Sequence, residues 1–429
     1  MMNSLSQHNI YIVDLSRYYA KAPRGKYYLV YAPLKGAFFI ADNISPDAIP
    51  QHLLSPDNDA LMRPHVSHPS QFSKLSILPN LTCNFKCAYC YSAKGRSRSV
   101  ISEEHITTML DYFVDGARIA DRELGIFISG GGEPTLTWDK VVFAVNYAEQ
   151  RAQSQGKTLN IMLMSNGSLI DDTIANFIKQ HGINIGISFD ILPEVQNSQR
   201  GKYDLVAANI KRLLSIGVIP SVSAVITPDN VCLMTQMVQE IVNNFSGIKH
   251  LNFDPAVSDE LFASEAELRA FYHSFADNFF NARALSGQHN ITLDCNAIRH
   301  AQKIFPRYCE GKLCLVPNGD ISMCHTVSSP KEIHYNDFTY GDVRDGMVKF
   351  DMAVFSRLVN SDNYLMDRCH DCIARWHCAG GCMMCRLNYN ADKMSAVCDF
   401  TADMTTRLLL HRLDEAMRRK YNKSIEEML

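Results

Sequence analysis

The sequence predicts an α/β fold whose centre is a partial (β/α)6 barrel. Between residues 73 and 285, short apolar runs alternate with amphipathic stretches, and six such pairs are too few for an eight-unit barrel. The strand-like runs are Leu75–Leu78, Ile126–Ser129, Leu159–Met164, Ile183–Ser188, Val218–Ile226 and Leu251–Phe253. The helix-like stretches are Ser102–Ala120, Trp138–Gln155, Ile170–Gln180, Tyr203–Ile216, Asn230–Asn244 and Ser264–Ala284. This alternation is typical of a parallel sheet covered by helices, which binds ligands at the carboxyl ends of its strands.

Two further domains are predicted on either side of the barrel. Residues 1–72 form a small α+β domain, because strand-like runs precede a short amphipathic segment at 46–54 and a linker at 55–71. The strand-like runs of this domain are Ile10–Val13, Tyr27–Tyr31 and Ala37–Ile40. Residues 286–429 form a C-terminal extension of loops, short runs and cysteines, which a helix at 401–421 closes.

Composition limits the compartment and the partners. The 429 residues include 42 lysines and arginines against 45 aspartates and glutamates, a balance that excludes a dedicated nucleic-acid binder. The amino-terminal residues lack the basic and apolar regions of a signal peptide, and no apolar run is long enough to span a bilayer. We therefore expect a cytoplasmic protein with no membrane partner, whose 14 cysteines bind metal rather than form disulfides.

The first cysteine cluster follows the first predicted barrel strand. Cys83, Cys87 and Cys90 lie on one short loop, where three thiolates could hold three irons of a four-iron cluster and leave the fourth iron open. The alternative is a structural zinc site, which fits poorly because such sites usually take four protein ligands. The pattern therefore favours an iron–sulfur cluster with one open position.

This loop resembles the signature of the radical S-adenosylmethionine (SAM) enzymes, Cys-x-x-x-Cys-x-aromatic-Cys, with Tyr89 as the aromatic residue. The resemblance implies a radical SAM barrel in which the open iron binds the amino and carboxylate groups of SAM. Reduction by one electron then cleaves SAM to methionine and a 5′-deoxyadenosyl radical, which abstracts a hydrogen from an unreactive C–H bond. The protein's part is to bind, orient and shield the reactants.

Later strands end in residues that resemble the cofactor-binding positions of the family. Gly130-Gly131-Gly132-Glu133-Pro134 ends the second strand, where glycines leave the backbone open and Glu133 could accept from the SAM amino group. The set that the resemblance assigns to SAM is Tyr89, Gly131, Gly132, Glu133, Ser165, Asn166, Ser188, Asp190 and Arg200. From the residues alone, Ser188, Asp190 and Arg200 could instead serve in helix capping and a surface ion pair.

The C-terminal cysteines resemble the SPASM domain, an extension of radical SAM enzymes that holds two auxiliary four-iron clusters. The resemblance assigns the first auxiliary cluster to Cys309, Cys314, Cys324 and Cys382, and the second to Cys369, Cys372, Cys378 and Cys398. With the first loop, it implies three [4Fe–4S] clusters, about 12 irons per chain. Two four-cysteine zinc sites are the alternative on chemistry alone. Cys232 and Cys295 are interpreted as packing residues, and the role of Cys385 stays open.

The resemblance also implies a peptide or protein substrate. We predict a maturase that abstracts a side-chain hydrogen from a ribosomally made precursor peptide and forms an intramolecular cross-link, with a carbon–carbon cyclophane favoured and a thioether next. Residues 1–72 would bind the leader of the precursor as an added strand. Five basic residues against one acidic residue in the first 35, together with several tyrosines, would suit an acidic leader. Electrons would come from a small molecule or a flavodoxin- or ferredoxin-type donor.

Two other functions stay open. An anaerobic sulfatase-maturating enzyme, which makes formylglycine, usually has an aspartate after the cysteine that matches Cys324, whereas this chain has His325. A non-catalytic iron–sulfur redox or binding protein is disfavoured by the intact cysteine loop and Glu133. Cross-linking also needs a general base. The candidates are Asp254, which ends the sixth strand, and His325, although either could have a structural role.

Overall fold

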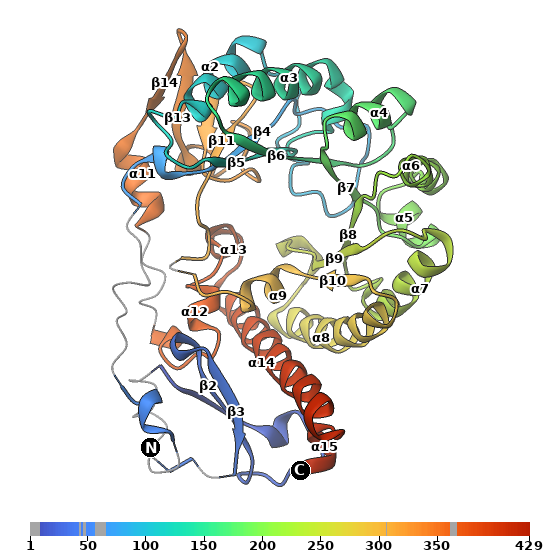
Figure 1. Ribbon diagram of the computed structural model, residues 1–429, viewed down its shortest axis with the longest axis vertical. Coiled ribbons are helices and arrows are strands. Elements are labelled where there is room, and N and C mark those ends of the chain that lie inside the picture. The colour runs from blue at the N-terminus through green and yellow to red at the C-terminus, as the bar shows by residue number, and fades with distance from the viewer. Residues whose placement is uncertain (1–8, 43, 46–48, 56–65, 306, 361–366) are drawn as a thin grey trace.

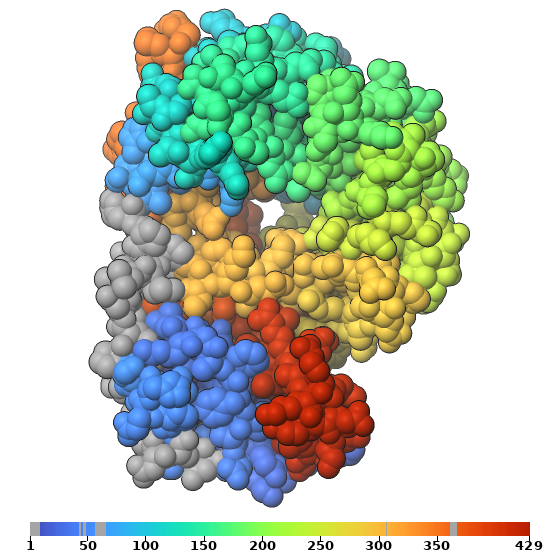
Figure 2. Space-filling model, in the orientation of Figure 1, coloured from blue at the N-terminus to red at the C-terminus, as the bar shows by residue number. Residues whose placement is uncertain are grey.

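A computed structural model describes residues 9–42, 44–45, 49–55, 66–305, 307–360 and 367–429. Within these residues the largest element is an 11-stranded sheet in the order β10-β9-β8-β7-β6-β5-β4-β11-β12-β13-β14. In Figure 1 the sheet curves as an open barrel, with helices on its outer side. The space-filling view in Figure 2 is hollowed near its centre, between the green half of the barrel and the yellow and orange residues below it.

The six predicted barrel strands are confirmed in their predicted order, and neighbours in the sheet pair in parallel. They are β4 (Lys74–Ile77), β5 (Glu123–Ile128), β6 (Thr158–Ser165), β7 (Asn184–Ser188), β8 (Ser221–Ile226) and β9 (His250–Pro255). The covering helices are α2 (Glu103–Val114), α3 (Trp138–Ser154), α4 (Asp172–Gln180), α6 (Tyr203–Ser215), α7 (Met234–Asn244) and α8 (Glu265–Gln288), and a short α5 (Pro193–Gln199) precedes α6. Apolar side chains of both layers form one buried core.

The parallel sheet is wider than the sequence indicated. β10 (Thr292–Asp294) pairs in parallel with β9, and β11 (Leu313–Leu315) pairs in parallel with β4 on the far edge. β12 (Asp320–Ser322), β13 (Thr339–Arg344) and β14 (Met347–Phe350) continue the sheet as antiparallel strands. Strands of three residues are too short for a hydrophobic period to be recognised. The C-terminal extension therefore begins inside the barrel sheet rather than beside it.

The amino-terminal strands form a separate three-stranded sheet, β1 (Tyr11–Asp14), β2 (Tyr28–Ala32) and β3 (Ala37–Ala41), in that order. One face packs against Trp376 of α12 (Arg375–Cys378) and Leu409 of α14 (Ala391–Tyr421), and the other covers the short helix η4 (Gln51–Leu53). Figure 1 shows this blue sheet beside the red helix α14. Residues 46–48 of the predicted amphipathic segment and 56–65 of the predicted linker lie outside the described residues.

Helix α14 begins ten residues before the predicted start at 401. The side chain of Asn390 accepts a hydrogen bond from Lys393 N at 2.9 Å and so caps the helix at this earlier point. Cys398 consequently lies on a helix and not in a loop. The remaining helices are α9 (Asn296–Ala301), α10 (Tyr335–Phe338), α11 (Met352–Val359), α13 (Met383–Asn388) and α15 (Ile425–Met428). No helix in the described part of the chain combines the length and the apolar character needed to cross a membrane.

A buried hydrogen bond joins the amino-terminal sheet to the C-terminal extension. His377 Nδ1 lies 2.5 Å from the carbonyl oxygen of Lys303, so Nδ1 donates and Nε2 accepts from the Tyr31 hydroxyl at 2.6 Å.

Tyr31→Phe leaves Nε2 unpaired, and we expect it to lower the free energy of opening of the amino-terminal sheet by about 1–3 kcal/mol. Tyr28→Phe is the matched control, because the Tyr28 hydroxyl bonds Gly25 O at the surface. Limited proteolysis measures both, and equal rates for the two variants would contradict the expectation.

Candidate functional site

Cys83, Cys87 and Cys90 lie on the loop that follows β4, at the carboxyl end of the barrel sheet. Each sulfur has an N–H donor: Arg96 Nη2 lies 3.4 Å from Cys90 Sγ, Arg200 Nη1 lies 3.8 Å from Cys87 Sγ, and Asn166 Nδ2 lies 4.0 Å from Cys83 Sγ. Burial raises the pKa of the Cys83 and Cys87 thiols, and the charges of Arg96 and Arg200 oppose it. Donors of this kind stabilise thiolates and tune an iron–sulfur cluster, so the loop fits the cluster that the sequence indicates.

The glycine run after β5 packs against the residues that lead into this loop. Gly132 N donates to Asn80 O at 3.0 Å, and Glu133 N donates to Thr82 O at 2.7 Å. A Cβ added at Gly132 would lie 2.1 Å from Thr82 O, and one added at Gly131, whose φ is +63°, would lie 2.5 Å from the Leu81 side chain. The expected opening of these glycines toward SAM stays a prediction. The structure supplies a different reason for glycine, which is close contact with the chain's own backbone.

The Glu133 carboxylate joins the ends of two barrel strands. It accepts from Ser165 Oγ at 2.8 Å, Asn166 N at 2.7 Å and Thr135 Oγ1 at 2.6 Å. Burial raises the pKa of Glu133, and these donors oppose the rise. Asn166 also donates from Nδ2 to Asn84 Oδ1 at 2.8 Å, on the cysteine loop. Three residues that the sequence assigns to SAM are thus brought together beside the cysteines.

A second buried group contains Tyr89, Asp190 and Arg200. The Tyr89 hydroxyl donates to Asp190 Oδ2 at 2.5 Å and accepts from Arg200 Nε at 2.5 Å, and Arg200 Nε lies 3.4 Å from Asp190 Oδ2. The Asp190 side chain is fully buried, so the alternative of a surface ion pair is wrong for this residue. Ser188 is the last residue of β7, two positions before Asp190. The assignment of these residues to SAM stays a prediction.

The two candidate bases already have partners. Asp254, in β9, accepts from Asn296 N at 2.5 Å through Oδ1 and pairs with Arg299 at 3.3 Å through Oδ2, so it ties β9 to the start of α9. Burial raises the pKa of Asp254, and Arg299 opposes the rise. Lys312 Nζ donates to His325 Nδ1 at 2.6 Å. Burial, with the Lys312 charge, lowers the pKa of His325 to about 3, which makes this imidazole a weak proton acceptor.

Electrostatic interactions link cysteines within each of the two sets that the resemblance assigns, and Cys385 interacts with a member of each set. Cys324 interacts electrostatically with Cys309 and Cys382, and Cys314 interacts with Cys324. In the second set Cys378 interacts with Cys369, Cys372 and Cys398. Among the described residues, no three His, Cys, Asp or Glu side chains form a site for a single metal ion. Ligation of clusters by the two sets stays a prediction.

A cavity of about 510 Å³ is lined by six cysteines, which are the four of the second set together with Cys382 of the first set and Cys385. Tyr11, Ile12 and Val13 of β1 line one side of it, and residues of α14 line another. The four thiols of the second set are a donor set that fits a [4Fe–4S] cluster, and two further thiols line the same cavity. The amino-terminal sheet therefore forms part of the wall around the predicted second auxiliary site.

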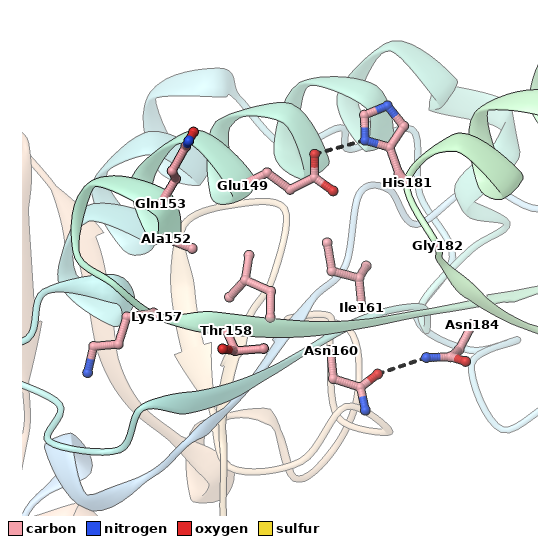
Figure 3. Close-up of a pocket in the computed structure, with 11 residues that line it drawn as sticks. Glu149, Ala152, Gln153, Lys157, Thr158, Asn160, Ile161, His181, Gly182 and Asn184 are labelled. Atoms are coloured by element: carbon pink, nitrogen blue, oxygen red, sulfur yellow. Dashed lines mark hydrogen bonds and ion pairs between the residues drawn. The ribbon is translucent and has the colours of Figure 1, made fainter.

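Another cavity, of about 640 Å³, lies at the opposite ends of the barrel strands (Figure 3). It is lined by the first residues of β6, by Asn184 at the start of β7 and by a pair in which His181 Nδ1 lies 2.8 Å from Glu149. The Asn184 side chain donates to Asn160 at 2.8 Å, as the dashed line in Figure 3 shows. Catalytic groups in such folds lie at the carboxyl ends of strands, so we do not assign the reaction to this cavity.

Three side chains near the cysteines were missed in the sequence. Arg96 bonds both Cys90 Sγ and Phe85 O, and its place in the basic run after the cysteine loop was a usable signal. Lys312 reaches His325 across a strand turn, which no periodicity indicates. Tyr91, which directly follows Cys90, contacts the ring of His325, which directly follows Cys324, edge-on at 6.3 Å between ring centroids.

Comparisons with known proteins identify part of the chain. Residues 77–231 match the family model described as the radical SAM superfamily. The serine-type anaerobic sulfatase-maturating enzyme of Klebsiella aerogenes is 24% identical over 204 residues, which are 46% of this chain and 48% of that protein. The first curated relatives are matched over only 58% and 33% of their own lengths.

Two solved structures have the same fold. The native anSMEcpe structure with bound AdoMet has a TM-score of 0.65 and 16% identity, over 80% of this chain and 99% of that one. The structure of Streptococcus suis SuiB bound to precursor peptide SuiA has a TM-score of 0.52 and 17% identity, over 76% of this chain and 75% of that one. At these identities the likeness concerns the fold.

The contact of Gly132 with Thr82 gives a prediction about the cysteine loop. Gly132→Ala places a methyl group against backbone that cannot turn away, so we expect a loss of about 1–3 kcal/mol in stability and a displaced loop. Gly287→Ala in α8 is the control, since a Cβ there meets no atom within 4 Å. Thermal unfolding and iron content after anaerobic reconstitution measure the two effects. Full iron content and unchanged unfolding in Gly132→Ala would show that the contact is unimportant.

Proposed function

Because residues 77–231 match the radical SAM superfamily, we propose that the chain is a radical SAM maturase that forms an intramolecular cross-link in a ribosomally made precursor peptide. The observation that carries this proposal is the combination of three cysteine groups with an amino-terminal sheet that has an open edge. Within the described residues, β3 pairs with β2 alone and has no strand partner on its other edge. An open edge of this kind can accept an extended peptide as an added strand.

The cysteine loop provides the reactive site of the proposal. With SAM, a [4Fe–4S] cluster held by Cys83, Cys87 and Cys90 supplies a 5′-deoxyadenosyl radical that abstracts a hydrogen from the substrate. Arg96 and Arg200 stabilise the thiolates through the N–H contacts described above. Glu133, held by Ser165 and Asn166, orients the amino group of SAM.

The two auxiliary sets suit the removal of an electron. Cross-linking after hydrogen abstraction leaves one further electron to be removed, and sets of four thiolates keep every iron bound to protein. The contact of Tyr91 with His325 supports a first auxiliary set near the reactive loop, because these two residues directly follow Cys90 and Cys324. An electron donor of the small-molecule, flavodoxin or ferredoxin type would reduce the reactive site.

Asp254 is the better of the two candidate bases. A general base works best when its pKa is near the working pH. Burial moves the pKa of Asp254 upward, toward neutrality, whereas burial and Lys312 move that of His325 down to about 3. Asp254 also belongs to β9 at the carboxyl side of the barrel, where parallel sheets bind their ligands.

The leader surface differs from the one that the sequence suggested. Tyr18, Tyr19 and Tyr31 pack toward α12 and α14, within the C-terminal extension. Because these tyrosines are packed there, we place the leader at the edge of β3 instead. Lys21 lies 3.4 Å from Glu426, an exposed pair of small energetic value. Arg24 and Lys26 are exposed, and we expect these two basic residues, rather than Lys21, to contact an acidic leader.

A formylglycine-forming sulfatase maturase is the second candidate. Its support is the likeness to the Klebsiella aerogenes enzyme and to anSMEcpe. The two functions differ in their product, because formylglycine is an aldehyde and a cross-link is not. Reaction of the modified peptide with a hydrazide separates them.

Co-expression with candidate precursor peptides, including any short peptide encoded beside this gene, tests the proposal. We expect each modification to remove two hydrogens from the peptide, to leave no hydrazide-reactive group and to join two residues in fragmentation spectra. The triple variant Cys83→Ala/Cys87→Ala/Cys90→Ala should form neither product nor 5′-deoxyadenosine. Cys232→Ala, an exposed cysteine outside all three sets, should behave as wild type. A hydrazide-reactive product would favour the sulfatase maturase, and 5′-deoxyadenosine from the triple variant would refute the cysteine assignment.

Charge reversal tests the leader surface. Arg24→Glu/Lys26→Glu should weaken binding of an acidic leader peptide, with an effect that shrinks as salt screens the charges. We expect about a tenfold rise in Kd at low salt, because each removed attraction contributes up to about 1 kcal/mol. Lys179→Glu/Lys249→Glu changes the net charge equally at exposed barrel positions and should leave Kd unchanged. Equal weakening by both double variants in fluorescence anisotropy would argue against a docking surface on the amino-terminal sheet.

A further inference from the structure

The chain around the first cysteine loop is basic and exposed to solvent. Residues 75–102 contain four basic residues and no acidic residue, although the whole chain has a net charge of −3. Three of the four, Lys86, Lys94 and Arg98, are exposed, and Arg96 is half-buried. The cysteines of this loop therefore lie beside a local positive charge that runs against the balance of the whole chain.

Two lysines from distant segments join the same surface. Lys202, the N-cap residue of α6, places its Nζ 5.3 Å from the centre of the Phe85 ring on the cysteine loop. Lys331 donates from Nζ to Arg96 O at 3.0 Å. Arg96 Nη1 donates in turn to Phe85 O at 2.6 Å, and its Nη2 lies 3.4 Å from Cys90 Sγ. These contacts connect both lysines directly to the loop that holds the reactive sulfurs.

Most of this positive charge has no carboxylate partner. Lys94 pairs with Glu260 at 2.8 Å, and this pair is exposed at both ends. Among the residues that the structure describes, no carboxylate forms an ion pair with Lys86, Arg98 or Lys202. An exposed cation without a partner adds fully to the attraction of a negatively charged surface.

Exposed apolar side chains lie among these cations. Val100, two residues after Arg98, is 45% exposed, and Ile333, two residues after Lys331, is 91% exposed. Protein interfaces combine apolar contact with a polar rim, whereas a free anion needs the cations alone. The combination therefore fits an acidic protein that has an apolar area of its own.

We propose that the basic surface, formed by Lys86, Arg98, Lys202 and Lys331, docks a small acidic electron donor of the flavodoxin type. This inference rests on the proposed function, in which the reactive cluster must take up one electron before SAM is cleaved. In the transfer the reduced flavin loses one electron and the cluster gains it, and no bond forms or breaks. A flavodoxin rather than a ferredoxin fits because the apolar ring of a flavin can contact the exposed apolar side chains.

Reduction of the reactive cluster by fully reduced flavodoxin, without any peptide, tests the surface. Lys86→Glu/Lys202→Glu reverses two of its cations and leaves Arg96, which contacts Cys90, in place. We expect reduction to be about tenfold slower at low salt, with a difference that shrinks as salt screens the charges. Rapid freezing and EPR follow the reactive cluster, whose signal is recognised by its change when SAM binds.

Charge reversal elsewhere on the chain provides the controls. Lys179→Glu/Lys249→Glu changes the net charge equally at exposed positions near the amino ends of β7 and β9, away from the cysteine loop. This control should be reduced at the wild-type rate. Equal slowing of both double variants would overturn the proposal. Slowing by Arg24→Glu/Lys26→Glu would also overturn it, because the donor would then dock on the amino-terminal sheet.

A small cationic reductant separates docking from damage to the cluster. Reduced methyl viologen is positively charged, so it should reduce Lys86→Glu/Lys202→Glu at least as fast as the wild type. Slower reduction by both reductants would overturn the proposal, since the substitutions would then act on the cluster itself. An effect seen with a ferredoxin and not with flavodoxin would overturn the choice of donor.

The same measurement distinguishes this inference from the proposed function. A wild-type chain without a SAM-responsive EPR signal would refute the cysteine assignment and the docking surface together. A normal signal with unequal flavodoxin rates would support the surface whatever product the chain forms, because no peptide takes part in the assay.

Discussion

The site depends on β4 having a parallel partner on each edge. β5 on one side ends in the glycine run and Glu133, and β11 on the other carries Cys314 in register with Ser76. The cysteine loop leaves the carboxyl end of the strand between them. Because parallel pairing fixes both register and direction, it sets the first loop, the glycine run and a member of the first auxiliary set at one edge. Any slip of β4 by one residue would reverse its inward and outward side chains and separate the three.

This arrangement buries two carboxylates, which is unfavourable. Hydrogen bonds and an ion pair around the carboxylates offset that free energy of burial. Glu133 and Asp190 are carboxylates with almost no exposed surface, and burial alone would favour their neutral forms. Glu133 is satisfied by hydroxyl and backbone donors alone, whereas Asp190 accepts from Val225 N and the Tyr89 hydroxyl and also pairs with Arg200. A buried ion pair of this kind fixes the positions of its side chains more than it stabilises the fold. It holds Arg200 against Cys87 and fixes Tyr89 at the middle of the cysteine loop.

Elements with a hydrophobic period and motifs with a characteristic residue spacing could be predicted from the sequence. Elements and contacts that have neither could not. The six barrel strands and their helices follow regular hydrophobic patterns, and the spaced cysteines of the first loop lie within residues 77–231, which match the radical SAM superfamily. β10 and β11 are too short to carry a pattern, and their place is set by pairing with distant strands. Contacts such as Lys312 with His325 depend on tertiary structure alone. Several tyrosines of the first domain were expected to suit an acidic leader, but Tyr18, Tyr19 and Tyr31 pack with residues of the C-terminal extension.

The strand order of the amino-terminal sheet keeps the cysteine cavity, at β1, apart from the proposed leader site, at β3. Within the described residues β1 and β3 are both edge strands, with β2 between them; β1 lines the cavity that contains the second cysteine set, and β3 is the edge proposed for the leader. Neighbouring strands lie about 4.8 Å apart, so a leader added to β3 would lie about 14 Å from β1 across the sheet. Such a leader would extend the sheet without entering the cysteine cavity. The rest of the peptide would then have to leave that edge and run to the carboxyl ends of the barrel strands, at about 3.3–3.6 Å per extended residue. The length of chain between leader and modified residues is thereby constrained by the position of the sheet on α14.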